Sequence, residues 1–252
     1  MDLTPYIAAG FSDDFDAMIA NTPVRGIDRD QVQRAVRLCP ETEHHLYEGG
    51  YSPTRVRYRA GARPVLEAIV ADWRSTSPRA SVLAAVAWVN RHVTHPHHTG
   101  PLRFDRAMTE EAIIESGIGW CNEQARVLIA LCEVMDIPAR LCFLFHESGR
   151  CSHAAGEAFV EGRWAFVDAT FNVSVPLPDG RLAEGRELSC AHRESAHRAY
   201  APALRRYYEA MAMEPEEASG WNRVFRPHPD RGGDLLHVLG ISNYVTAGVE
   251  GA

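Results

Sequence analysis

Three residues in the middle of the chain have the types and the order of a catalytic triad. Cys121 follows the stretch G-I-G-W, His153 follows a polar stretch, and Asp168 ends an apolar run. A cysteine, a histidine and an aspartate can act as nucleophile, as base and as the group that orients the base. The chemistry that they could carry out is attack on an acyl carbon.

We predict that Cys121 lies at the N-terminus of a helix. Residues 122–135 suit a helix, Gly119 permits a tight turn before it, and Pro138 ends it. The positive end of the helix dipole stabilises a thiolate there, and free backbone N–H groups can receive an oxyanion. The helix face that carries Cys121 is expected to pack on a sheet through three small or apolar residues: Ala125, Leu128 and Cys132.

A hairpin is expected to bring His153 to Asp168. Residues 161–162, Glu-Gly, form a plausible two-residue turn, which pairs Val160 with Arg163. His153 then lies on the same face of the sheet as Asp168, two residues before the position directly opposite it on the neighbouring strand. At this diagonal position a long side chain can reach Asp168. We expect three aromatic residues on this face to cover the cysteine helix: Phe159, Trp164 and Phe166. The opposite face carries three small residues: Ala154, Gly156 and Ala158.

These motifs resemble those of the transglutaminase-like superfamily: a Cys at a helix start, then G-I-P-A-R, H-A-x-x-E-V, a Trp, and D-P-T. The chain has D-I-P-A-R at 136–140, H-A at 153–154 with Glu157, Trp164, and D-A-T at 168–170. The departures are three residues: Asp136 for Gly, Ala155 for the usual aromatic, and Ala169 for Pro. The resemblance covers about a quarter of the chain directly.

The resemblance implies an α+β fold with a papain-like core, in which the cysteine helix packs on an antiparallel sheet. It also implies that Cys121, His153 and Asp168 are the catalytic triad. We expect residues 63–185 to form this transglutaminase-like catalytic core. Residues 1–62 are expected to form a helical N-terminal extension, and residues 186–252 a helical C-terminal extension that packs on the core.

Composition narrows the classes of partner and compartment. The net charge of −7 argues against a nucleic-acid surface, and no apolar run is long enough to span a membrane. The start of the chain lacks a basic region typical of a secretory signal. The six cysteines lie mostly in apolar runs, which favours reduced thiols and a cytoplasmic protein. No metal, nucleotide or flavin motif is present, so we expect no cofactor.

Other residues compete for roles at the site. Cys151 and His146 are the weaker rivals of the nucleophile and the base. Trp120, Asn122 and Gln124 are candidates for lining the substrate entrance.

Three further features are interpreted as structural and not as parts of the site. The stretch H-P-H-H at 95–98 could suggest a metal site, but proline breaks the geometry, and we interpret it as a solvated loop. Trp88 is interpreted as a core residue; the resemblance to transglutaminases, some of which use an upstream tryptophan as oxyanion donor, implies that role as the alternative. Glu157 is expected to be buried and paired with Arg126 or Arg140.

The triad predicts a cysteine enzyme that acts on an amide, peptide or thioester carbonyl through a covalent thioester. Water as the second nucleophile makes it a peptidase or amidase, and an amine makes it an acyltransferase. Arylamine N-acetyltransferases offer a partial resemblance to the second alternative. A non-catalytic binding module on the same fold is the third.

The size of the substrate is inferred from the two ends of the chain. We expect packed helices at both ends to narrow the cleft to a pocket, and so a small acyl or short peptide substrate.

Overall fold

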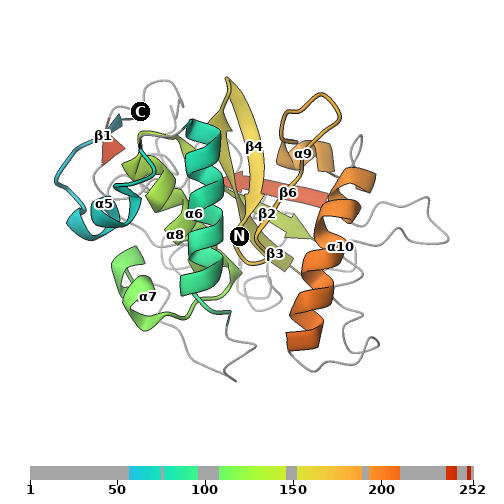
Figure 1. The fold of residues 1–252 in the computed structure, drawn as a ribbon, viewed down its shortest axis with the longest axis horizontal. Coiled ribbons are helices and arrows are strands. Elements are labelled where there is room, and N and C mark those ends of the chain that lie inside the picture. Colours follow the sequence, from blue (N-terminus) through green and yellow to red (C-terminus); the bar gives the residue numbers. More distant parts are fainter. Residues whose placement is uncertain are drawn as a thin grey trace, which may run out of the picture.

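The computed structural model describes residues 57–74, 77–95, 108–145, 152–188, 193–210, 237–242 and 249–250. A five-stranded antiparallel sheet lies between two groups of helices (Figure 1). The predicted helices of residues 1–56 lie outside the described residues. The α+β class predicted from the sequence is confirmed.

The sheet has the strand order β5-β4-β3-β2-β6. Its strands are β2 (Ala139–Phe145), β3 (Ser152–Val160), β4 (Arg163–Asp168), β5 (Val173–Ser174) and β6 (His237–Ser242). The hairpin of β3 and β4 has the predicted register, with Val160 paired to Arg163. Glu161 and Gly162 both have positive φ, at 54° and 78°, as a tight hairpin turn requires.

Four helices lie on one side of the sheet: α5 (Pro64–Val70), α6 (Pro78–His92), α7 (Glu110–Ser116) and α8 (Cys121–Val134). Of these, α6 and α8 contact the strands, whereas α5 and α7 pack on α8. Pro64 and Pro78 occupy first turns, where their missing N–H costs nothing. Ser77 and Thr109 cap α6 and α7 by accepting bonds from backbone N–H groups three residues on. Local sequence therefore sets where these two helices begin.

The small-residue face of β3 packs on α8, which corrects the predicted assignment of the two faces. Ala154 and Ala158 belong to the apolar core shared with α8, and a Cβ on Gly156 would lie 3.4 Å from Leu128. Small residues allow a helix to approach a sheet closely, whereas large rings would hold it away. Phe166, on the opposite face, packs instead in a second core with Tyr200.

The second core lies between the other face of the sheet and two further helices, α9 (Gly185–Leu188) and α10 (Arg193–Ala210) (Figure 1). Its buried members include Leu188, Ala196 and Ala203. The expected long C-terminal helix is thus present as α10, and it packs on the sheet side opposite α8.

The sequence predicted a helical C-terminal segment, but this segment also contains strands. Residues 237–242 form β6, which pairs with β2 at the edge of the sheet, where a helical extension was expected. A two-stranded pair joins β1 (Arg57–Tyr58) to β7 (Val249–Glu250). An edge strand has ladder partners on one side only, so its sequence carries a weaker pattern than that of a central strand.

Within the described ranges, none of the helices is both long enough and apolar enough to cross a membrane.

Candidate active site

Cys121 is the first residue of α8, as predicted, and is half-buried. Gly117, at φ 67°, ends α7 in the left-handed conformation and so makes the turn that the sequence assigned to Gly119. Gly119 has a different role, because a Cβ there would lie 2.8 Å from the Cβ of Glu123 and 3.1 Å from Val93. Close packing, and not turn geometry, requires glycine directly before the cysteine helix.

His153 and Asp168 form a buried pair on adjacent strands. The Nε2 atom of His153 donates to Oδ2 of Asp168 at 2.7 Å, and neither side chain is exposed. The acceptor is a carboxylate, so the proton of the pair lies on Nε2 of the imidazole. The ring of Phe171 lies against the imidazole, with centroids 5.3 Å apart. The diagonal placement predicted from the hairpin is therefore present in the structure.

Asp168 accepts hydrogen bonds on both oxygens. Oδ1 accepts from the backbone N–H groups of Thr170, at 2.9 Å, and Phe171, at 3.3 Å. Oδ2 accepts from His153 and also from the hydroxyl of Tyr200, at 2.5 Å. These four donors compensate the burial of the charge and fix the orientation of the carboxylate.

The surroundings of His153 favour its charged form. Burial alone would lower its pKa, but the charge and hydrogen bond of Asp168, with smaller contributions from Cys121, raise the pKa to about 10. An imidazolium that lies between a carboxylate and a cysteine can stabilise the thiolate form of that cysteine. It can also donate a proton to a leaving group.

Gln124 ties the turn after Asp168 to the first turn of α8. Its Oε1 accepts from the hydroxyl of Thr170 at 2.6 Å, and its Nε2 donates to the carbonyl of Val93 at 2.6 Å. Asn90 donates to the carbonyls of Ala169 and Thr170 at 3.0 and 2.8 Å. The side chain of Gln124 is buried and used in structure, so it does not line a substrate entrance as we expected.

Trp120 and Asn122 flank the cysteine with different exposure. Trp120 is half-buried, and its ring meets that of His95 edge-on, with centroids 5.1 Å apart. Asn122 is buried. His95 is also buried, which corrects the reading of this residue as part of a solvated loop; residues 96–98 lie outside the described ranges. Of the three tentative substrate-binding residues, Trp120 alone has a partly exposed side chain.

Of the two partners predicted for Glu157, the structure pairs it with Arg140, on β2. The Nε atom of Arg140 donates to Oε2 of Glu157 at 2.7 Å, and Oε1 accepts from the backbone of Gly185 at 2.6 Å. The guanidinium of Arg140 also lies 3.8 Å from the ring centre of Trp164. Arg126, the other candidate, pairs with Glu110. Glu157 therefore joins β2, β3 and α9 and is structural.

Three other residues were considered for the site: Trp88, Cys151 and His146. Trp88 stacks on His92, with centroids 4.3 Å apart, and meets Trp73 edge-on. Cys151 and His146 lie outside the described residues. Among the side chains that the structure describes, no three of His, Cys, Asp or Glu gather into a metal site.

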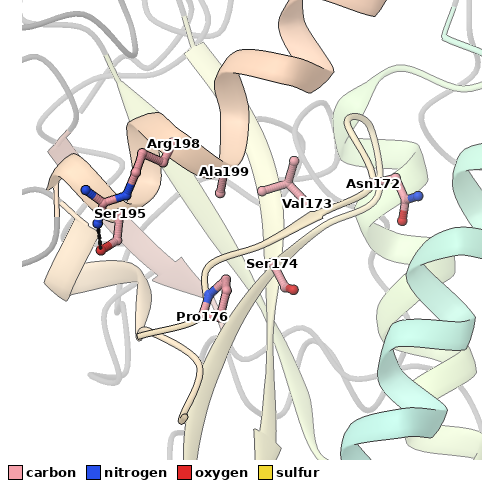
Figure 2. A pocket seen from close by; sticks show the side chains of 7 residues that line it. All are labelled: Asn172, Val173, Ser174, Pro176, Ser195, Arg198 and Ala199. Carbon is pink, nitrogen blue, oxygen red and sulfur yellow. Dashed lines mark hydrogen bonds between the residues drawn. The ribbon is translucent and has the colours of Figure 1, made fainter. Parts of the chain in front are cut away.

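A pocket of about 460 Å³ lies between β5 and α10 (Figure 2). Its wall on the helix side consists of Ser195, Arg198 and Ala199, and Arg198 donates to Ser195 at 3.1 Å. The other wall consists of Asn172, Val173, Ser174 and Pro176. Neither Cys121 nor His153 lines it, so it is separate from the candidate triad.

Sequence reasoning missed three residues that hold Asp168 or the turn after it: Asn90, Thr170 and Tyr200. Thr170 has a local signal, since an aspartate commonly accepts from the backbone N–H two residues on. Asn90 and Tyr200 lie 79 and 32 residues from their partners in the chain. No local pattern marks contacts over such separations.

The family model of the Transglutaminase-like superfamily matches residues 67–169, which include Cys121, His153 and Asp168. No curated protein matches the sequence. Among solved structures, a Cytophaga hutchinsonii protein provisionally named a cysteine protease is 18% identical at a TM-score of 0.35, over 73% of this chain and 51% of that chain.

Two further solved structures are similar to parts of the chain. One, named as a TGase, is 17% identical at a TM-score of 0.35, over 42% of this chain and 30% of that chain. A Parabacteroides distasonis protein, provisionally named a protease, is 12% identical at a TM-score of 0.33, over 48% of this chain and 26% of that chain. The chain spans about half or less of the length of the three structures.

Proposed function

We propose that this chain, whose residues 67–169 match the family model of the transglutaminase-like superfamily, is a cysteine-nucleophile hydrolase that acts on an amide, peptide or thioester carbonyl. Cys121 is the nucleophile, His153 the general acid and base, and Asp168 the group that orients the imidazole. One observation carries the proposal: a buried His–Asp pair, 2.7 Å between Nε2 and Oδ2, interacts with a cysteine that opens a helix.

In the first half-reaction the thiolate of Cys121 attacks the carbonyl carbon, and the electron pair of the C=O bond moves to oxygen. The first N–H groups of α8 have no partner within the helix and can donate to this oxyanion. When the tetrahedral intermediate collapses, the bond to the leaving group breaks and His153 gives that group its proton. An acyl thioester on Cys121 and a free amine or thiol result.

In the second half-reaction His153 takes a proton from water, and the hydroxide attacks the thioester. The carboxylic acid leaves, and the sulfur of Cys121 returns to a thiolate beside the imidazolium. Asp168 stabilises the imidazolium and keeps the Nε2 proton in place throughout, without itself becoming protonated. If an amine attacks in place of water, the same groups perform acyl transfer.

The test is acylation of the intact protein by p-nitrophenyl acetate, a generic donor of a small acyl group. We expect release of p-nitrophenol with an initial burst, and mass spectrometry of peptides should place the acetyl group on Cys121. Cys121→Ser should remove the burst. Cys132→Ala is the matched control, because Cys132 is a buried core residue of the same helix, and it should keep the burst.

Addition of an amine separates the alternatives. Acetyl transfer to the amine faster than hydrolysis would make the chain an acyltransferase. A protein that is not acetylated at Cys121 by any of a panel of activated esters, and whose Cys121 reacts with iodoacetamide no faster than a free thiol at about pH 6, would be a binding module and would contradict the proposal.

A further inference from the structure

Tyr200 brings a hydroxyl from the C-terminal helix to the predicted triad. It lies on α10, is completely buried, and contacts the rings of Phe166 and Phe171. Its hydroxyl donates to Oδ2 of Asp168 at 2.5 Å. A buried tyrosine needs a partner for its hydroxyl, and here the partner is the carboxylate that also holds His153.

The two carboxylate oxygens of Asp168 accept hydrogen bonds from different kinds of donor. Oδ1 is held by the backbone N–H groups of Thr170 and Phe171, which fix the carboxylate to its own turn. Oδ2 receives two side-chain donors, His153 and Tyr200. Two donors on one oxygen compete for its electron density, so a bond from the tyrosine weakens the bond to the imidazole. The orientation of the carboxylate therefore survives loss of Tyr200, while its hold on His153 changes.

We propose that Tyr200 is a positioning residue that shares Oδ2 of Asp168 with His153 and thereby sets how strongly the carboxylate binds the imidazole. This inference rests on the proposed function in giving His153 and Asp168 a catalytic role. Its consequence is that α10, which lies beyond the residues that match the family model, contributes to the site. Without the hydroxyl, Asp168 would hold the proton on Nε2 more tightly, and His153 would be a poorer proton donor to a leaving group.

The titratable groups that face this cluster come from four other elements. They are Cys121 on α8, His153 on β3, Asp168 on β4 and Cys142 on β2. Burial, then the charge and the hydrogen bond of Asp168, raise the pKa of Tyr200 well above its ordinary value, so the phenol stays protonated and remains a donor at neutral pH.

The test is the NMR signal of the Nε2 proton of His153 in the 252-residue chain at neutral pH. Labelling with ¹⁵N-histidine and comparison with His153→Gln assign the signal among the twelve histidines. In Tyr200→Phe we expect the proton signal to move downfield, because its bond to Oδ2 shortens when the competing donor is gone. The pKa of His153 should rise by about one pH unit, the worth of one charge-assisted hydrogen bond.

Tyr58→Phe is the matched control. The hydroxyl of Tyr58 also donates to a carboxylate, Oε1 of Glu67 at 2.5 Å, but this pair lies away from the triad. The control should leave the His153 signal in place. An unchanged or upfield-shifted signal in Tyr200→Phe would overturn the proposal, since a merely structural tyrosine would change only the melting temperature.

A second variant covers failure of Tyr200→Phe to fold. Fluorotyrosine at position 200 keeps the shape of the side chain and makes the phenol a stronger donor, so the His153 signal should move upfield. No shift there would also overturn the proposal. The readout needs no substrate: if Cys121→Ser keeps full esterase activity, the proposed function fails while the result on the hydrogen bond stands.

Discussion

Asp168 makes hydrogen bonds that an asparagine cannot reproduce. All four donors to the carboxylate are N–H or O–H groups, two on each oxygen. In Asp168→Asn the backbone donors of Thr170 and Phe171 select the amide oxygen, which leaves the amide nitrogen facing His153 and Tyr200. Donor then meets donor, and His153 must change tautomer. We expect the esterase rate to fall by about four orders of magnitude.

The same conflict should lower the melting temperature of Asp168→Asn, because two buried donors lose their acceptor. Asp179→Asn is a matched control on the surface, where the carboxylate pairs with Arg181 and is 59% exposed. It should change neither the rate nor the stability appreciably. A loss of activity below about tenfold in Asp168→Asn would show that Asp168 is only a structural residue at the end of β4.

His153 should make the stability of the protein depend on pH in one direction. Its pKa is raised from 6.5 in the unfolded chain to about 10 in the folded protein. The folded state therefore binds the proton more tightly, and the resulting stabilisation is complete below the unfolded pKa. It decreases as the pH rises through the window between the two values and is lost above the folded pKa.

The measurement is the free energy of unfolding of the wild type and of His153→Gln, each by urea titration across this window. The advantage of the wild type should be largest at its acidic end and should shrink steadily towards pH 10. A difference that stays constant with pH, or that grows, would mean that His153 is neutral in the folded protein.

At the scale of elements, the sequence predicted correctly the features that depend on neighbouring residues, such as a hairpin turn. The turn at Glu161 and Gly162 gave the register of the hairpin, and hence the diagonal between His153 and Asp168. The alternation of β3 also separated its two faces correctly, but it could not say which helices cover which face. That choice depends on how closely α8 can approach small residues such as Gly156, and this is a property of the packed pair of elements.

The join between α7 and α8 gives an element-scale prediction. A methyl group in Gly119→Ala would meet the Cβ of Glu123 at 2.8 Å and Val93 at 3.1 Å, so the first turn of α8 must shift relative to the end of α6. We expect a loss of about 1–3 kcal/mol in stability. Alkylation of Cys121 by iodoacetamide should slow at the same time, because the thiol moves relative to His153.

Gly162→Ala supplies the contrast. Nothing lies within 4 Å of a Cβ at this position, but its φ of 78° strains any L-residue. It should cost about 1 kcal/mol and leave the alkylation rate of Cys121 unchanged. Equal slowing in both variants would mean that the rate follows global stability and not the placement of α8.

At the scale of the whole molecule, the sequence reading was weakest where distant segments meet. It divided the chain at residue 185 into a catalytic core and a helical extension, and this division remains a prediction. The backbone of β6 nevertheless completes the edge of the sheet, and Tyr200 reaches Asp168. Neither contact has a signal in the local sequence, because each depends on chain segments brought together only by the complete fold.

The last prediction follows from these long-range contacts. A chain of residues 57–185 would keep Cys121, His153 and Asp168 but would lose α10 and β6. Phe166 and Phe171, buried at 0% and 4% exposure, would lose the cover of Tyr200. β2 would lose its pairing with β6 and become an unprotected edge. We expect this fragment to bind a hydrophobic dye such as ANS and to unfold without a cooperative transition.

A chain of residues 57–252 is the control and retains every described element. It should unfold cooperatively by circular dichroism and keep a reactive Cys121. If the shorter fragment also shows a sharp transition and reacts with iodoacetamide at the rate of the control, residues 186–252 are dispensable for the site. In that case the carboxylate of Asp168 would be held adequately by Thr170 and Phe171 alone, and α10 would serve only to cover the sheet.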